Sequence, residues 1–177
     1  MPYLQDLSCD GNNLTHLELP KTNNLRSLFC GNNQLVSIDL HNVNLFSLRI
    51  DSNNFSEINI QNQPDLFSLH LNGNQISTLD LSNNPNLWSI NIQGNPIEEI
   101  DFSQNLELGY IYLGDNQIAF LDLSVNQKLR RISNEGEFTL EKICVWTLPF
   151  PPPCIDIFTN ISLENFPSDF DGFVICD

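Results

Sequence analysis

The chain repeats itself with a nearly constant period. Seven units begin with a leucine, and consecutive units are 21 residues apart except for one pair that is 20 apart. A chain made of such units folds as a stack of similar coils, because one unit alone cannot bury its apolar side chains. This period constrains the fold more than any other feature. The leading leucines are Leu4, Leu25, Leu45, Leu66, Leu87, Leu108 and Leu129.

Each unit contains two halves with a similar pattern. The unit from Leu66 reads LFSLHLNGNQISTLDLSNNPN, in which LxxLxLxxN is followed by LxxLDLxxN. Apolar and polar residues alternate in LxL, which is the period of a strand with one buried face. The Asn-Gly and Asn-Asn pairs that follow are typical of turns. We therefore predict a β-rich solenoid with little helix, in which short parallel strands lie on both sides of each coil.

An asparagine recurs after each half of the unit. Backbone groups lose their ladder partners where the chain bends, and an inward amide can satisfy a donor and an acceptor there. We predict this structural role for the whole column. In the second half Thr22, Val43 and Gln63 replace asparagine, which predicts less regular bends in the N-terminal coils. The asparagines are Asn12, Asn33, Asn53, Asn74, Asn95 and Asn116 in the first half, and Asn84, Asn105 and Asn126 in the second.

These repeats resemble the nested, 21-residue IRREKO type of bacterial leucine-rich repeat, LxxLxLxxNxLxxLDLxxNxx. On this basis residues 1–131 form the solenoid and residues 132–177, which lose the asparagine signal, form a C-terminal capping region. The stretch CVWTLPFPP within that region resembles the C-terminal part of leucine-rich-repeat proteins from Bacteroidetes. The resemblance implies a secreted or cell-surface protein. No signal peptide follows Met1, so the alternatives are a fragment or a cytoplasmic protein.

The five cysteines fall into two groups. Cys9 and Cys30 are 21 residues apart at an inward position, and we predict buried, free thiols there. Cys144, Cys154 and Cys176 lie in the capping region, where an exported protein would form one disulfide. A zinc site is the alternative, although CxxC and a nearby histidine are lacking. The family resemblance implies that Cys144 pairs with Cys176.

The charge of the chain limits its partners. Asp and Glu number 22 against 7 Lys and Arg, a net charge of −15, which would repel a nucleic acid backbone. No apolar run approaches the roughly 20 residues of a membrane span. Six outward second-half residues form a nearly uniform acidic column, and stacked carboxylates repel one another unless they are hydrogen-bonded, protonated or bridged by cations such as calcium. We expect no other cofactor. The column is Glu18, Asp39, Asn59, Asp80, Asp101 and Asp122.

The first-half strands vary much more on their outward face. All four arginines of the chain lie on this side, with several aromatic residues, and Arg, Trp and Tyr dominate binding hot spots. A variable face opposite a regular one predicts recognition on the variable face. Phe46, Phe67 and Trp88 have the alternative of packing under loops as a second small core. The predicted ligand-binding residues are Arg26, Phe29, Arg49, Phe67, His70, Trp88, Asn91, Tyr110, Tyr112 and Arg131.

No catalytic motif is visible in the sequence. G-x-S-x-G, H-E-x-x-H and phosphate-binding loops do not occur, and His70 is predicted on the opposite sheet from His16 and His41. We therefore predict a non-catalytic module for protein binding or adhesion, with glycan binding through the same aromatics as the alternative, and a spacer without a ligand as a third. The first coil has no cap before it, so we expect it either to follow missing residues or to pair with another chain.

Overall fold

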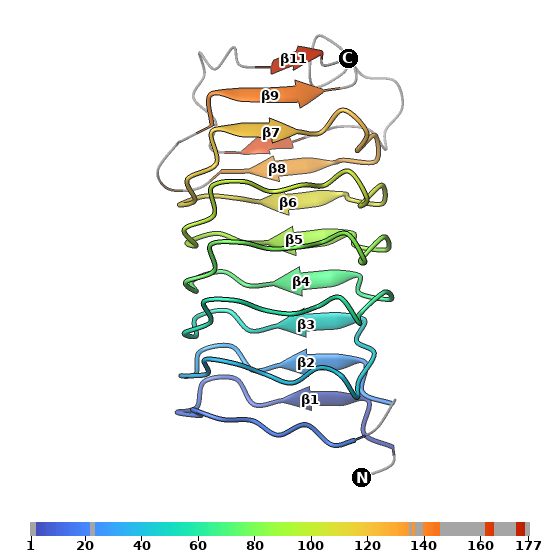
Figure 1. Ribbon diagram of the computed structural model, residues 1–177, viewed down its shortest axis with the longest axis vertical. Helices are drawn as coiled ribbons and strands as arrows, with labels where there is room; N and C mark the ends of the chain where they lie inside the picture. Colours follow the sequence, from blue (N-terminus) through green and yellow to red (C-terminus); the bar gives the residue numbers. More distant parts are fainter. Residues whose placement is uncertain are drawn as a thin grey trace.

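The protein is a stack of coils that rises along its long axis (Figure 1). The computed structural model describes residues 3–21, 24–134, 136, 140–145, 162–164 and 173–175. These residues contain short strands and no helix. The strands are β1 (Asp6–Ser8), β2 (Ser27–Phe29), β3 (Ser47–Arg49), β4 (Ser68–His70), β5 (Ser89–Asn91), β6 (Tyr110–Tyr112), β7 (Phe120–Asp122), β8 (Arg131–Ser133), β9 (Lys142–Val145), β10 (Ser162–Glu164) and β11 (Phe173–Ile175).

Eight of the strands form one parallel sheet, which we call the main sheet. Its order is β1-β2-β3-β4-β5-β6-β8-β10, and each pair from β1 to β8 is offset by one repeat, so that Leu48 lies opposite Leu69 and Leu69 opposite Ile90. Equivalent positions of successive repeats therefore stack in straight columns. The predicted solenoid of parallel strands is confirmed.

The opposite side of each coil is paired less extensively. Its strands β7, β9 and β11 form a three-stranded parallel sheet and run in the opposite direction to the main sheet (Figure 1). In the preceding coils the described second-half segments form no strand. Residues 142–145 read KICV, which lacks the LDL-turn pattern and favours a strand, and this segment gives β7 its partner.

The core is a continuous column of aliphatic side chains between the two sides. The inward residue of each strand from β2 to β8 is completely buried, and the second-half leucines and isoleucines pack against it. Phe55 and Phe102 take positions that are aliphatic in most other coils and are 0% and 1% exposed. In the first coil Leu7 and Cys9 are only partly buried.

The first-half asparagines connect one coil to the next. The Nδ2 of Asn53 donates to the carbonyl oxygens of Cys30, Ile50 and Asp51 at 3.0, 3.0 and 3.2 Å, and its Oδ1 accepts the Leu35 N–H at 2.9 Å. The same interactions with the preceding coil confirm the predicted structural role for the other buried members of this column. These are Asn33, Asn74, Asn95 and Asn116.

Gln63 corrects one prediction about the second-half bends. The 20-residue unit lacks a residue between Val43 and Leu45, and the Leu45 N–H is instead accepted by Gln63 Oε1 at 2.8 Å. The Nε2 of Gln63 donates to the carbonyl oxygens of Leu40 and Val43. This completely buried glutamine donates to the same two carbonyl positions of the preceding coil as Asn84 does in its own coil. The expectation of a less regular bend at Gln63 is therefore wrong. Thr22 lies outside the described residues.

The chain beyond residue 131, where we predicted the capping region, continues both sheets. Strand β10 pairs with β8, and β11 pairs with β9, each in parallel. Cys144 is disulfide-bonded, whereas Cys154 and Cys176 lie outside the described residues. Cys9 and Cys30 are free, as predicted.

Candidate functional site

The outer face of the main sheet brings most of the predicted ligand-binding residues together. The last residue of each strand from β1 to β6 points outward, and the strand register places neighbouring members directly opposite one another, for example Arg49 against His70. The adjacent outward column contains the small residues Ser47, Ser68 and Ser89, followed by Tyr110 and Arg131. The first column reads Ser8, Phe29, Arg49, His70, Asn91 and Tyr112.

Three aromatic rings stack at the beginning of the main-sheet strands, and we call them the aromatic ladder. The ring centroids of Phe46 and Phe67 are 4.8 Å apart with planes at 7°, and those of Phe67 and Trp88 are 6.2 Å apart at 14°. The guanidinium of Arg130 lies over the Trp88 ring, 5.0 Å from its centroid, and Tyr110 contacts the same ring edge-on. Phe46 is 50% exposed, so the ladder lies on the surface and is not the loop-covered second core that the sequence left open.

Gly109 leaves the space that Trp88 occupies. A Cβ atom at position 109 would lie only 2.7 Å from Trp88 Cζ2, which is far inside van der Waals contact. The glycine therefore lets Trp88 extend over the next coil toward Arg130. The sequence shows this glycine in the column but not its purpose.

Replacement of Gly109 by alanine is expected to displace Trp88 and to lower the free energy of unfolding by about 1–3 kcal/mol, because the new methyl group overlaps the ring. Denaturant unfolding measures the cost, and tryptophan fluorescence in a Trp146→Phe background reports the displacement. In a Trp88→Ala background the cost of Gly109→Ala should disappear. An equal cost in both backgrounds would show that the overlap is not its cause.

A groove of about 640 Å³ runs along the aromatic ladder, and we call it the aromatic groove. Arg26, Asp65 and Glu107 line it together with the three rings. Its charges are matched internally: Arg26 pairs with Asp65 at 3.5 Å, and Lys128 pairs with Glu107 at 2.5 Å. Sequence analysis did not identify Asp65 or Glu107, because these residues precede the leading leucine of a unit.

Arg49 and His70 sit at the centre of the outer face. The Nε of Arg49 donates to both oxygens of Asp51, at 3.2 and 3.1 Å, which anchors the guanidinium. Burial lowers the pKa of His70; Asp51 opposes this shift and Arg49 adds to it. The imidazole is therefore neutral at pH 7 and offers one donor and one acceptor. The centre of the face combines a fixed cation with a neutral hydrogen-bonding ring.

Turn hydrogen bonds account for the acidic column on the opposite side. The Oδ1 of Asp101 accepts the N–H of Ser103 at 2.7 Å, and Asn59 makes the same bond to Gln61 at 3.1 Å. A hydrogen bond from the His41 backbone is the main cause of the lowered pKa of Asp39. Glu18 differs from these residues, because its Oε1 lies 3.6 Å from Nε2 of His16. No group of three or more His, Cys, Asp or Glu among the described residues is arranged to hold a metal ion.

Comparisons with solved structures agree with this architecture. The functional domain of InlJ from Listeria monocytogenes, which includes a cysteine ladder, matches with a TM-score of 0.71 at 19% identity over 98% of this chain and 41% of that chain. The internalin InlF from Listeria monocytogenes matches with a TM-score of 0.66 at 22% identity over 80% of this chain and 47% of that one. The chain has a leucine-rich-repeat fold. It spans less than half the length of these two proteins.

A third internalin, InlC2 of Listeria monocytogenes, matches with a TM-score of 0.65 at 19% identity over 97% of this chain and 80% of that chain. No family model matches the sequence, and no curated protein matches it. At these identities the likeness to internalins concerns the fold alone. Among the described residues there is no helix that is long and apolar enough to cross a membrane.

Proposed function

We propose that this leucine-rich-repeat chain is a non-catalytic binding module that recognises a protein through the outer face of its main sheet. The observation that carries the proposal is the strand register, which aligns Phe29, Arg49, His70, Asn91 and Tyr112 in one column. Arg and Tyr are residue types that dominate protein interfaces. An uninterrupted column of such side chains along a rigid sheet suits a protein partner, because the sheet holds them in place without a conformational change.

The aromatic ladder favours a protein over a glycan. A sugar ring stacks on a free aromatic face, but Phe67 lies along one face of Trp88 and the guanidinium of Arg130 over the ring. Trp88 therefore offers mainly its edge, which contacts apolar side chains well. The aromatic groove beside it is lined by three rings and internally paired charges, and it suits an apolar side chain of a protein partner.

We further propose that the protein works at the cell surface or in the extracellular medium, as an adhesion module. The disulfide at Cys144 supports this, since disulfides persist in oxidising compartments. Cys9 and Cys30 stack at one repeat position, a short counterpart of the cysteine ladder of InlJ. Burial and neighbouring Cys9 raise the pKa of Cys30 to about 12, so this thiol stays protonated and suits a packing role.

The test is binding of the purified chain to arrays of extracellular proteins and, in parallel, to glycan arrays. We expect a protein ligand whose affinity falls by tenfold or more in an Arg49→Ala/Tyr112→Ala variant, on the order of the effect of a single hot-spot residue, and falls further as salt rises. The matched control is Asp39→Asn/His41→Ala on the opposite side, which should bind as the wild type does.

Two results would contradict this proposal. Binding only to glycans, insensitive to salt and dependent on Tyr112, would support the glycan alternative. Binding to both arrays that is unchanged by Arg49→Ala/Tyr112→Ala and by Trp88→Ala would place recognition elsewhere on the molecule.

A further inference from the structure

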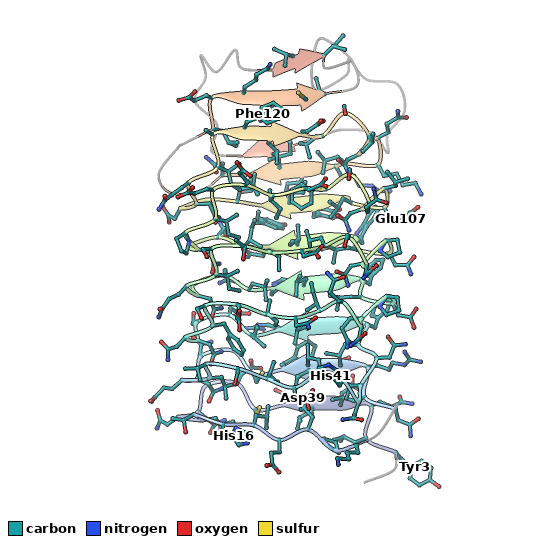
Figure 2. All side chains as sticks on the ribbon, in the orientation of Figure 1. Tyr3, His16, Asp39, His41, Glu107 and Phe120 are labelled. Atoms are coloured by element: carbon teal, nitrogen blue, oxygen red, sulfur yellow. The ribbon has the colours of Figure 1, made fainter. Side chains whose placement is uncertain are left out.

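A second groove lies on the opposite side from the main sheet, and we call it the acidic groove. It has a volume of about 700 Å³ and is formed by residues 78–80, 98–101, 119, 120 and 122 of three successive coils. Phe120, at the start of β7, lies at its C-terminal end (Figure 2). The acidic groove shares no lining residue with the aromatic groove.

The floor of the acidic groove is apolar because backbone hydrogen bonds do not hold these described segments of neighbouring coils together, and apolar side chains stay partly exposed between them. No backbone hydrogen bond among the described residues joins residues 98–101 to β7. Leu79 and Ile100 are consequently only partly buried, whereas Leu121, at the equivalent position in β7, is completely buried. Phe120 is 49% exposed. Exposed apolar area of this kind, when it is enclosed by a polar rim, is typical of interaction sites.

The rim of the acidic groove consists of carboxylates that form no ion pair within the part of the chain that the structure describes. Five of its ten lining residues are acidic and none is basic. None of the five makes an ion pair with a described residue, in contrast to Asp65 and Glu107 of the aromatic groove. Bringing a cation here would therefore gain electrostatic attraction without breaking an existing pair. The five are Asp80, Glu98, Glu99, Asp101 and Asp122.

One cation of the chain already uses the edge of this groove. The Nζ of Lys142, from β9, lies 5.7 Å from the centroid of the Phe120 ring. This is within the range of a cation–π interaction. The ring of Phe120 thus provides an apolar contact and an attractive surface for an ammonium or guanidinium group.

We propose that the acidic groove is a second binding site, which takes an extended protein segment in which basic and apolar side chains alternate. In an extended segment successive side chains point to opposite sides, so one set would reach the floor at Leu79, Ile100 and Phe120. Lysines or arginines of the other set have stems long enough to bend back and place their charges on the carboxylate rim. The site is independent of recognition by the main sheet.

A short fluorescein-labelled peptide of alternating lysine and leucine is the probe, and its affinity for the full chain is measured by fluorescence anisotropy. The variant Glu99→Gln/Asp101→Asn is expected to bind it about five- to tenfold more weakly, with a smaller salt dependence. The asparagine at 101 keeps the acceptor for the Ser103 N–H, as Asn59 does in its own coil. The matched control Glu18→Gln/Glu57→Gln removes the same charge from the same two columns outside the groove and should stay within about twofold of the wild type.

Two further variants test whether the apolar floor contributes to peptide binding and whether removal of a nearby positive charge raises the affinity. Phe120→Ala should weaken binding by about fivefold while the salt dependence remains. Lys142→Ala should strengthen binding by about two- to threefold, because it removes a competing positive charge. Loss of fold cannot explain a gain in affinity. Arg49→Ala/Tyr112→Ala should leave peptide binding unchanged, which separates this proposal from the one for the main sheet.

Three results would overturn the proposal. Equal losses in Glu99→Gln/Asp101→Asn and in its matched control would mean that the peptide responds only to the overall charge of the chain. A peptide of alternating lysine and serine that binds as tightly would show that the apolar floor is not used. Weaker binding by Lys142→Ala would contradict the predicted competition.

Discussion

Replacement of Asn53 by alanine is expected to lower the free energy of unfolding by about 2–4 kcal/mol. The change removes the amide that donates to three carbonyl oxygens and accepts the Leu35 N–H. The buried Leu35 N–H is left without an acceptor, whereas each of the three carbonyl oxygens keeps one other donor, from Asn33, Asn74 or the Asn32 backbone. The unpaired N–H costs roughly 1–3 kcal/mol, each of the other lost hydrogen bonds costs about 1 kcal/mol or less, and the shared geometry keeps the sum below full additivity. A domain of this kind is stable by only about 5–15 kcal/mol, so the loss is large.

Denaturant unfolding followed by circular dichroism measures this loss. Asn54→Ala is the matched control: residue 54 is exposed, and its side chain makes no hydrogen bond with a described residue, so the cost should stay within about 0.5 kcal/mol. Asn53→Asp keeps an acceptor for Leu35 but places a buried carboxylate oxygen against three carbonyl oxygens, and at neutral pH it should cost at least as much as Asn53→Ala. Equal stability of Asn53→Ala and Asn54→Ala would show that the asparagine column does not hold the coils together.

Replacement of Phe102 by alanine is expected to cost about 3–5 kcal/mol through a cavity in the core. Its side chain is 1% exposed and is among the largest fully buried ones of the described chain. The equivalent position holds Leu81 in the preceding coil and Leu123 in the following coil. Deletion of a buried phenyl ring removes its transfer free energy and leaves a void that a stiff stack fills poorly.

The same unfolding experiment compares two controls. Phe120→Ala truncates a ring that is 49% exposed and should cost about 1 kcal/mol or less. Phe102→Leu restores the residue found in the neighbouring coils and should recover more than half of the loss. If Phe102→Ala and Phe120→Ala were equally stable, the phenyl ring of Phe102 would not be part of a tightly packed core.

Sequence periodicity predicts which side chains point inward, and the structure confirms this from coil to coil. Periodicity carries no information on whether neighbouring segments approach closely enough to pair. Leu79 and Leu121 stand in identical LDL motifs, yet only Leu121 belongs to a paired strand and is completely buried. The acidic groove opens for this reason, and a column of aspartates in the sequence does not reveal it.

The sequence predicts which residues of the candidate site are neighbours in the stack, but it does not predict how their side chains are arranged on the surface. Spacing alone places Arg49 beside His70 and Phe46 beside Phe67, because the period is nearly constant. Whether the rings stack on the surface or pack beneath loops depends on side-chain torsions and on the gap at Gly109, which no repeat pattern encodes. The role of Gln63 was missed because the sequence pattern compares residue types and not the reach of a side chain.

The side chain of Gln63 couples the twenty-residue coil to its successor, because it donates to Leu40 and Val43 of that coil and accepts the Leu45 N–H that follows the shortened turn. The shortened turn of this coil removes the backbone carbonyl that the first N–H of the following coil would use, as the Leu66 N–H uses that of Gln63, and the long amide of Gln63 in the following coil accepts this N–H instead. These two coils are therefore not interchangeable modules. A duplication, recombination or engineered splice that preserves this stack has to inherit them as one piece.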